Sequence, residues 1–307
     1  MGRPSIPPEQ LLQMLYTVRS QRLLMKEMDY NLLLRWFVGL NADDDVWDPT
    51  TLTKNRDRLL QADLANEFLA RVVGQASAQG LTSDEHFTVE VTLLEAWAGA
   101  TSFQAKEGKA PTSPDDLGSP TGDFQGEQCS NETHESNTDP EARLARNGTG
   151  KESKLSYCGN LLVENPNGLI VAAEVFQANG TAERDAALVM LEKLPGTRPL
   201  TVGGDKGFDT QGFVAECRHM RVWPHVAQNH KPPGGAIDGR TTRHSGYAIS
   251  QRKRKRIDEC FGWLKTIALI RKLRHRGVCK VDWILTFACA AYNLVRMRNL
   301  AAAVPAV

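Results

Sequence analysis

The strongest constraint on the fold is a change in the spacing of apolar residues at His86. Upstream segments follow the spacing of three to four that helices require, whereas Phe87 to Leu93 alternates with the period of a strand. Further strands are predicted at 154–164, 169–177, 199–203 and 222–226, with helices at 181–194 and 211–220. This order predicts an α/β domain, a mixed five-stranded sheet flanked by helices. An amphipathic helix is expected at 282–298.

Residues 1–80 are predicted to form a separate all-α domain. Short helices joined by tight turns carry basic side chains on their outer faces, including Arg56. This pattern suits a helix-turn-helix DNA reader. A small helical bundle without DNA contacts would have the same pattern, so both interpretations stay open.

Residues 81–300 are assigned to a second domain that contains an insertion at 104–152. The insertion is rich in Gly, Pro, Ser, Thr, Asn and acids and has almost no large apolar residue. Such a composition cannot bury enough apolar surface to order itself. The insertion is therefore expected to be exposed and partly disordered.

The net charge of +1 hides a strong asymmetry along the chain. Acids dominate residues 107–142, whereas Arg and Lys dominate residues 240–276. A basic segment of this density favours a polyanionic partner. The sequence thus predicts a nucleic-acid contact in the C-terminal third.

The basic segment contains a predicted helix from Tyr247 to Lys265. Five consecutive cations at 252–256 precede an acidic pair, and the spacing places Arg254, Asp258 and Lys265 on one helix face. The cations could hold phosphates while the carboxylate holds a metal ion. A solvated helix with ordinary i,i+4 salt bridges is the alternative.

Three acids are candidates for a metal site. Glu90 lies in the middle of a predicted strand, Asp205 follows a short apolar strand among glycines, and Asp258 lies on the basic helix. The glycines at 203, 204 and 207 are expected to let a phosphate backbone approach. Such a trio could bind two Mg²⁺ ions for phosphoryl transfer. An outward-facing Glu90 and a simple Asp-Gly turn at Asp205 are the alternatives.

Long runs of the sequence resemble bacterial insertion-sequence transposases of the DDE superfamily, specifically the insertion-sequence-five family. The matching runs are Gly2-Arg-Pro-Ser-Ile-Pro-Pro, Met28-Asp-Tyr-Asn-Leu, Arg35-Trp-Phe-Val-Gly-Leu, Leu52-Thr-Lys-Asn-Arg-Asp-Arg-Leu, Ser83-Asp-Glu-His-Phe, Leu94-Glu-Ala-Trp, Ser130-Asn-Glu-Thr-His, Gly180-Thr-Ala-Glu-Arg, Asp205-Lys-Gly-Phe-Asp, His225-Val-Ala-Gln-Asn, Ile237-Asp-Gly-Arg-Thr-Thr-Arg-His and Ala291-Tyr-Asn-Leu-Val-Arg. The resemblance implies a ribonuclease-H-like catalytic domain and an N-terminal helical DNA-binding domain. It also implies that the protein cuts and joins double-stranded DNA at terminal inverted repeats and inserts it into a target, acting as a homo-oligomer.

The resemblance also implies roles for individual residues. Glu90, Asp205 and Asp258 would be the catalytic metal ligands for two Mg²⁺ ions, with Mn²⁺ as a substitute, and Lys265 would position phosphate. The expected DNA-binding residues are Arg56, Lys206, Arg243, His244, Tyr247, Arg252, Lys253, Arg254, Lys255 and Arg256. The family usually has Asp at position 90 and Glu at position 258, Gly at position 91 and Arg at position 250, where this chain has Val91 and Ser250.

Two further functions stay open beside an active transposase. The exchanged acids are compatible with a degenerate copy that binds DNA without cutting it, and the same site would serve a nuclease that only hydrolyses. The first residues lack the apolar stretch of a secretory signal, and no apolar run reaches about 18 residues. Six cysteines without a CxxC pair favour reduced thiols. A bacterial cytoplasmic, nucleoid-associated protein without a membrane span is expected.

Overall fold

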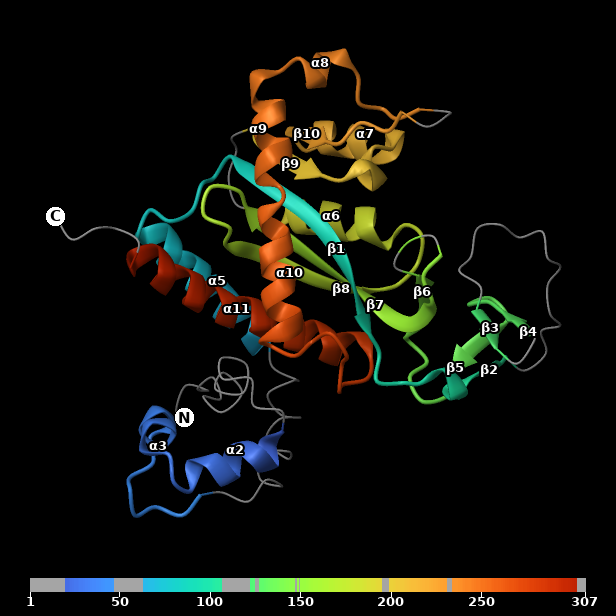
Figure 1. Cartoon of the computed structure of the whole chain (residues 1–307). Helices are drawn as coiled ribbons and strands as arrows, with labels where there is room; N and C mark the ends of the chain where they lie inside the picture. The colour runs from blue at the N-terminus through green and yellow to red at the C-terminus, as the bar shows by residue number, and fades with distance from the viewer. Residues whose placement is uncertain are drawn as a thin grey trace.

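A central six-stranded mixed sheet organises the computed structural model (Figure 1). The structure describes residues 20–46, 63–106, 122–124, 127–146, 148, 150–194, 199–230 and 234–302. The strands are β1 (His86–Glu95), β6 (Arg143–Arg146), β7 (Ser153–Glu164), β8 (Ile170–Gln177), β9 (Leu200–Gly204) and β10 (Val222–Val226). They confirm the five strands expected from the sequence and add β6.

The order across the sheet is β10, β9, β1, β7, with β6 and β8 sharing the far edge of β7. β1 runs antiparallel to β7 and parallel to β9, and β9 runs parallel to β10. The first and fourth predicted strands are therefore neighbours, as expected. This pairing brings the end of β9 next to the middle of β1.

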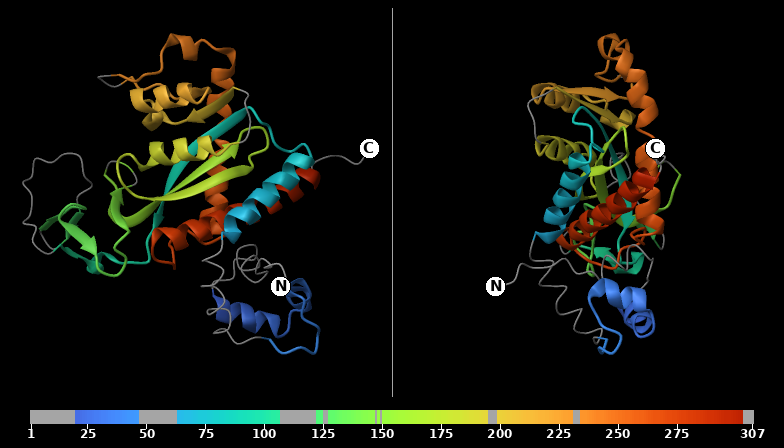
Figure 2. Two further views of the ribbon diagram at one scale, coloured as in Figure 1. Left: turned by 180° about the vertical axis from the view of Figure 1, so that it is seen from behind. Right: turned by 90° about the vertical axis from the view of Figure 1, so that its left-hand side faces the viewer.

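Helices cover both faces of the sheet (Figure 2). One face packs on α6 (Ala182–Glu192) and α7 (Gln211–His219), through an apolar cluster that includes Phe87 and Val89 of β1. The other face packs on α5 (Leu64–Ala78), α10 (Arg256–Thr266) and α11 (Val278–Ala302), through a cluster that includes Leu94. The alternation of β1 thus sends its odd and even residues to different helical layers.

The helix α5 belongs to the core of the α/β domain and not to the N-terminal helical domain in which it was predicted. Its residues Ala65, Leu69, Val72 and Ala76 are buried in the same apolar cluster as α11. The ring of Phe68 lies 5.2 Å from that of Phe287. This helix, predicted within a helical domain at 1–80, therefore packs with the α/β domain through its apolar stripe.

Two short helices precede this core, α2 (Gln21–Met28) and α3 (Leu32–Val38). Ser20 caps α2 and Asn31 caps α3 by accepting backbone N–H groups of the first turn. They have their own small apolar cluster and lie below α11 in Figure 1. The predicted helix at 54–60, with Arg56, lies outside the described residues, so the helix-turn-helix hypothesis stays a prediction.

The end of the predicted insertion is folded where disorder was expected. Beyond two small two-stranded sheets, β2 (Phe103–Ala105) with β5 (His134–Ser136) and β3 (Gly122–Phe124) with β4 (Glu127–Cys129), the segment continues into β6 of the main sheet. Asp139 is buried and accepts a hydrogen bond from the Tyr157 hydroxyl at 2.6 Å. The carboxylate of Glu141 accepts the backbone N–H of Val278, the first residue of α11, at 2.8 Å. Polar contacts order this part, and apolar periodicity does not report them.

Helix α11 is the described helix whose length and composition would suit a membrane span, with a mean hydropathy of 1.3 over 18 residues. No apolar segment of this length was expected from the sequence. In the fold 61% of that window is buried, with Trp283 and Phe287 stacked 5.0 Å apart inside the core. Its apolar character follows from its place between the sheet and α5. Cys158, Cys217, Cys260, Cys279 and Cys289 are free thiols, as expected.

Candidate active site

The strand β1 directs Glu90 toward the basic C-terminal helices. Val89 packs toward α6 and α7, so Glu90 and Thr92 face the side of α10. Thr88 pairs with Gly203 in the parallel register, which places Asp205, two residues later, level with Glu90. Two of the predicted metal ligands therefore emerge side by side from adjacent strands.

Asp205 is held by a tight turn at the end of β9. Its Oδ1 accepts the backbone N–H of Gly207 at 2.7 Å and caps the short 3-10 helix η2 (Lys206–Phe208). A Cβ on Gly207 would lie 2.9 Å from that same oxygen and 3.6 Å from Oε2 of Glu183. Gly207 thus admits two carboxylates close to the chain.

The glycines at 203 and 204 have a different role from the one expected. A Cβ on Gly203 would meet Thr88 Oγ1 at 3.2 Å and Cβ of Arg254 at 3.7 Å. A Cβ on Gly204 would meet Phe208 at 3.1 Å. Side chains of the protein itself fill this space, so these two glycines serve internal packing and do not leave room for a phosphate.

The predicted single helix over 247–265 is two helices, α9 (Ser245–Lys253) and α10. The α-helical ladder stops at Arg254 and Lys255, where the N–H of Ile257 bonds to the carbonyl of Arg254 in a tighter 3-10 turn. The break re-aims Arg254, whose Nη1 lies 3.6 Å from Oε2 of Glu90. The basic segment therefore contacts Glu90 of β1 at the break between α9 and α10.

Helix α9 is fixed on β10 by polar contacts. The Tyr247 hydroxyl donates to the carbonyl of Val226 at 3.1 Å, and Gln251 Nε2 donates to that of His225 at 2.5 Å. Ser250, where family members have an arginine, is buried with its Oγ 2.9 Å from Nδ1 of His225. An arginine would not fit this contact, so the departure at Ser250 is matched by the packing of His225.

The electrostatics of Glu90 show that the charges of three other acids act on it. Burial raises the pKa of the Glu90 carboxyl to about 7, and the negative charge of Asp205 adds most to that effect. Asp258 and Glu183 raise this pKa further, whereas Arg254 lowers it. The charges of both other predicted ligands therefore act on Glu90, along with that of Glu183, an acid for which no role was predicted.

This raised pKa predicts a pH dependence of stability in the metal-free protein. The folded state binds the Glu90 proton more tightly than the unfolded chain, whose pKa is near 4.5. The resulting stabilisation is complete below pH 4.5 and is lost as the pH rises to about 7, by at most about 1.4 kcal/mol per pH unit. Urea unfolding in EDTA should therefore show a larger loss between pH 5 and pH 8 for the parent than for Glu90→Gln. Equal losses would contradict the assignment.

The donor set fits a divalent cation in its chemistry. Carboxylate oxygens are the ligands that Mg²⁺ prefers, and a cation would offset the clustered negative charge that raises the pKa of Glu90. Within the part of the chain that the structure describes, no three acidic, histidine or cysteine groups already converge at metal-binding distance. Binding would therefore require the side chains to draw together, and Glu90 to exchange Arg254 for the ion.

Lys265 reaches the same strand as Arg254. Its Nζ donates a hydrogen bond to Thr92 Oγ1, two residues along β1 from Glu90. Burial lowers the pKa of the Lys265 ammonium, and the charge of Arg271 adds to this effect. Asp258 is exposed in the first turn of α10, between the two cations in sequence.

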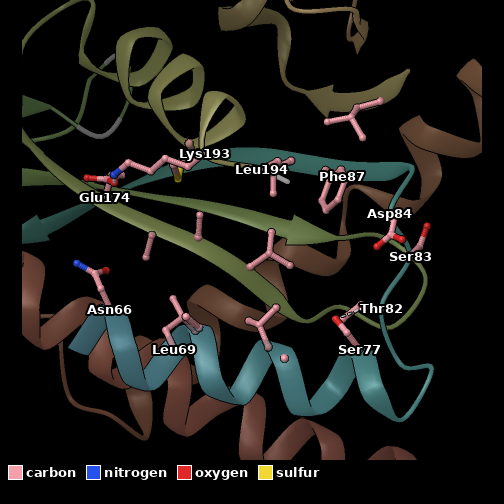
Figure 3. Close-up of a pocket in the computed structure, with 18 of the residues that line it drawn as sticks. Asn66, Leu69, Ser77, Thr82, Ser83, Asp84, Phe87, Glu174, Lys193 and Leu194 are labelled. Atoms are coloured by element: carbon pink, nitrogen blue, oxygen red, sulfur yellow. Dashed lines mark hydrogen bonds and ion pairs between the residues drawn. The ribbon is translucent and has the colours of Figure 1, made fainter. Parts of the chain in front are cut away.

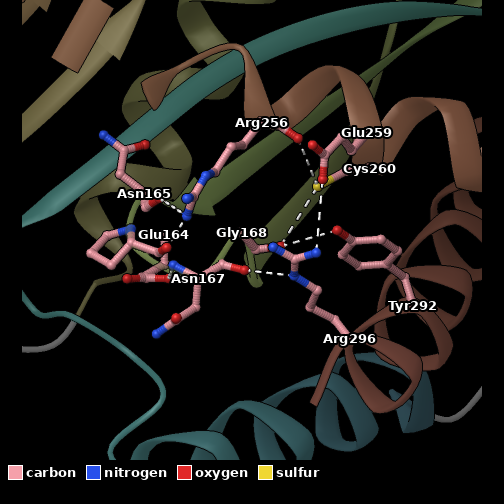
Figure 4. A network of polar contacts seen from close by, with 10 residues as sticks. Glu164, Asn165, Asn167, Gly168, Arg256, Glu259, Cys260, Tyr292 and Arg296 are labelled. Carbon is pink, nitrogen blue, oxygen red and sulfur yellow. Dashed lines mark hydrogen bonds and ion pairs between the residues drawn. The ribbon is translucent and has the colours of Figure 1, made fainter. Parts of the chain in front are cut away.

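The other predicted DNA-binding residues fall into two groups. Several are exposed and directed to solvent: Lys206, Arg243, His244, Arg252 and Lys255. Lys253 is half-buried, as are Tyr247, Arg254 and Arg256. Arg256 donates to the carbonyls of Asn165, at 3.1 Å, and Pro166, so its guanidinium is already bound (Figure 4). Its predicted DNA contact therefore competes with a structural one.

Figure 4 shows how this turn anchors the C-terminal helices. Arg296 Nε donates to the carbonyl of Asn167 at 2.7 Å, and the Tyr292 hydroxyl donates to that of Gly168 at 3.2 Å. Both helices, α10 and α11, are thus hydrogen-bonded to the turn between β7 and β8. The position of α10 over Glu90 is set by this network.

Asp209 ends the run Asp205-Lys-Gly-Phe-Asp, but no role was predicted for it from the sequence. It is buried, and its carboxylate accepts the backbone N–H groups of Asn229, Ala236 and Ile237 at 2.7–2.8 Å. These bonds fix the two ends of the loop that leads to α8 (Gly239–Thr242) and the basic helices. The only sequence feature that could have indicated this role is an acid that precedes, at a distance, a loop rich in Gly and Pro.

A cavity of about 610 Å³ lies elsewhere, between α5, β8 and the end of α6 (Figure 3). Leu69, Val73 and Met190 give it an apolar wall, and Glu174 pairs with Lys193 at its rim. None of the three predicted metal ligands lines it. It is separate from the acidic cluster.

Comparisons with known proteins give two family matches. Residues 133–294 match the family model described as "Transposase DDE domain", and residues 1–58 match "Transposase domain (DUF772)". The first match includes Asp205, Asp258 and Lys265 but begins after Glu90. No curated protein matches the chain.

Among solved structures, the similar ones include a pre-cleavage Mos1 transpososome at 11% identity, covering 95% of this chain and 81% of that chain with a TM-score of 0.24. The Mos1 strand transfer complex has 8% identity and the Mos1 mariner paired-end complex with Mn has 10%, each covering 97% of this chain and 80% of that chain with a TM-score of 0.24. At these TM-scores the likeness carries no weight for the fold.

Proposed function

The chain belongs to the DDE transposase family, and we propose that it is a transposase of the insertion-sequence-five group that cuts and joins DNA at terminal inverted repeats. The observation that carries the proposal is the emergence of Glu90 and Asp205 side by side from adjacent strands, with Arg254 Nη1 3.6 Å from Glu90 Oε2. The negative charge of Asp258, on α10, acts on Glu90 as well and supports its place in the same site. Acids clustered beside cations are suited to phosphoryl transfer at a DNA backbone.

The acids would hold the catalytic cations, and the protein's other residues would hold the DNA. When bound, a pair of Mg²⁺ or Mn²⁺ ions supplies an activated water or 3′-hydroxyl and neutralises the leaving oxygen. Glu90 and Asp205, fixed on adjacent strands, provide the less mobile ligands, whereas the exposed Asp258 can adjust from α10. This division would accommodate the exchange of Asp for Glu at position 90 and of Glu for Asp at position 258, because the longer acid at 90 would offset the shorter reach of the acid at 258.

Basic side chains would orient the phosphate at the scissile bond. Arg254 and Lys265 both reach β1 on the side of Glu90 and would bind phosphate oxygens once metal ions occupy the carboxylates. Exposed Arg243, His244, Arg252 and Lys255 would extend this contact along the duplex. Such contacts position DNA and do not read its sequence.

The arrangement of domains is part of the proposal. The mixed sheet, with the acids at β1 and the end of β9 and a basic helix across it, supports a ribonuclease-H-like catalytic domain. The match of residues 1–58 to a transposase domain supports a DNA-binding role for the helical segment. Two element ends must meet for transposition, so we expect a homo-oligomer on DNA, acting at the nucleoid in a bacterial cytoplasm.

A second candidate is a transposase copy that binds DNA without cutting it. The ion pair between Arg254 and Glu90 favours it, because this contact occupies a carboxylate that a metal would need. The two candidates differ in the fate of the DNA backbone.

Incubation with end-labelled DNA from the flanks of the gene separates these functions. A transposase yields nicked ends and products joined to a second DNA, a nuclease yields nicks alone, and a binder yields only a shifted band. Joined products that require Mg²⁺ or Mn²⁺ are expected. A retarded band without any strand break would support the second candidate.

A further inference from the structure

We propose that Glu183 is a fourth carboxylate of the active site and binds a catalytic cation together with Asp205. This inference rests on the proposed function and adds a ligand that the family triad does not include. Glu183 comes from α6, on the opposite face of the sheet from α10. The site would thus be closed from both helical layers.

The first turn of α6 is fixed against the Asp205 turn. Asn179 Oδ1 accepts the N–H of Ala182 at 2.7 Å and so anchors the start of the helix. Arg184 donates to the carbonyls of Gly207, at 3.3 Å, and Gly180, at 3.0 Å. Glu183, between these anchors, is therefore held at Gly207, where its Oε2 lies 3.6 Å from the position that a Cβ would take.

Asp205 shares that position with Glu183. Its Oδ1 lies 2.9 Å from the same Cβ position, so the two carboxylates approach Gly207 from different elements. The negative charge of Asp205 adds to burial in raising the pKa of Glu183, and the charge of Glu183 in turn raises that of Glu90. Asp205 is therefore the acid common to Glu90 on one side and Glu183 on the other.

Among the described residues the carboxylate of the half-buried Glu183 accepts no hydrogen bond, and the charge of Arg184 only partly offsets the effect of Asp205 on its pKa. Two other acids of this fold accept backbone N–H groups. Glu164 accepts the N–H groups of Asn167 at 2.8 Å and Ser83 at 3.3 Å, and Asp209 accepts three. An acid placed beside another acid without a donor costs stability in the absence of a ligand. A cation between Glu183 and Asp205 would remove that cost.

The test compares Glu183→Gln with Asp185→Asn, an exposed acid in the same helical turn. Thermal unfolding is measured in EDTA and in MnCl₂, and Mn²⁺ binding is titrated by calorimetry. In EDTA, Glu183→Gln should unfold about 2 °C higher than the parent, because one repulsive charge is gone. Its Mn²⁺ affinity should fall about 10-fold, whereas Asp185→Asn should match the parent in both.

A parental Mn²⁺ affinity in Glu183→Gln would overturn the proposal, as would a lower unfolding temperature in EDTA, which would mark a structural role. Asp205→Asn in the same titration separates this inference from the proposed function. If Asp205→Asn loses Mn²⁺ and Glu183→Gln does not, only the fourth ligand is refuted. If the parent binds no Mn²⁺, the metal site itself fails and this inference with it.

Discussion

Asp205→Asn is expected to reduce DNA strand cleavage by at least about 10³-fold while leaving the protein folded. Asp205 is the acid that both Glu90 and Glu183 face, so its charge is central to the cluster. Removing a metal-binding carboxylate forfeits several kcal/mol of transition-state stabilisation, and each 1.36 kcal/mol corresponds to a factor of ten in rate. Single-turnover cleavage of end-labelled DNA in Mg²⁺ measures the loss.

Asp205→Asn removes the negative charge of the side chain and keeps its size, so a loss of cleavage reports on the charge. Asparagine keeps an oxygen that can accept the N–H of Gly207, so the cap of η2 survives. The unfolding temperature in EDTA should stay equal to or above that of the parent, since a repulsive charge is removed. Cleavage within tenfold of the parent would show that Asp205 is not a metal ligand.

Asp209→Ala is expected to lower the free energy of unfolding by about 3 kcal/mol or more. The change leaves three backbone N–H groups without their acceptor, that of Ile237, which is buried, and those of Asn229 and Ala236, which are part-buried. Each unsatisfied group costs about 1–3 kcal/mol. Urea denaturation gives the difference, and for a domain of this size a loss of 3 kcal/mol corresponds to a drop of about 10 °C in Tm.

Asp209→Asn and Asp185→Asn are the matched comparisons. Asparagine at 209 retains one acceptor oxygen and should recover part of the lost stability, whereas the exposed Asp185 should tolerate the change within about 0.5 kcal/mol. DNA affinity should fall in Asp209→Ala, because the loop leads directly to the basic helices. If Asp209→Ala is as stable as Asp185→Asn, the three hydrogen bonds do not anchor the loop.

Apolar periodicity predicted the strands and helices of the sheet with errors of at most four residues at their ends. The strand at 86–95 and the helix at 182–192 are visible because each buries one face, which leaves its period in the sequence. The neighbourhood of β1 and β9 followed from the order of the elements. These features depend on residues close together in the chain.

Contacts between polar groups that are distant in the chain produce no periodic pattern in the sequence. The segment around Asp139 and Glu141 looked disordered because it is ordered by hydrogen bonds to Tyr157 and Val278. Helix α5 was assigned to the wrong domain because its apolar stripe does not say which partner covers it. The helix break at Arg254 is imposed by the packing of α9 on β10 and of α10 on the β7–β8 turn.

The candidate site shows the same division. Glu90, Asp205 and Asp258 could be proposed from strand position, glycine context and the basic helix, and the structure places Glu90 beside Asp205, with Asp258 exposed on α10. Glu183 could not, because its first-turn position on α6 reads as an ordinary helix-start acid. Its approach to Gly207 depends on the packing of the first turn of α6 against the turn that follows β9.

The most direct test of the account is strand cleavage and joining in Mg²⁺ by the unmodified protein, beside Glu90→Asp/Asp258→Glu. The account predicts that the unmodified protein cuts and joins at the element ends, because the longer acid on β1 and the shorter one on α10 compensate each other. If only the double variant cuts, the exchanged acids have abolished catalysis and the chain at most binds DNA. If neither cuts, the carboxylate cluster is not a transposase active site in this protein.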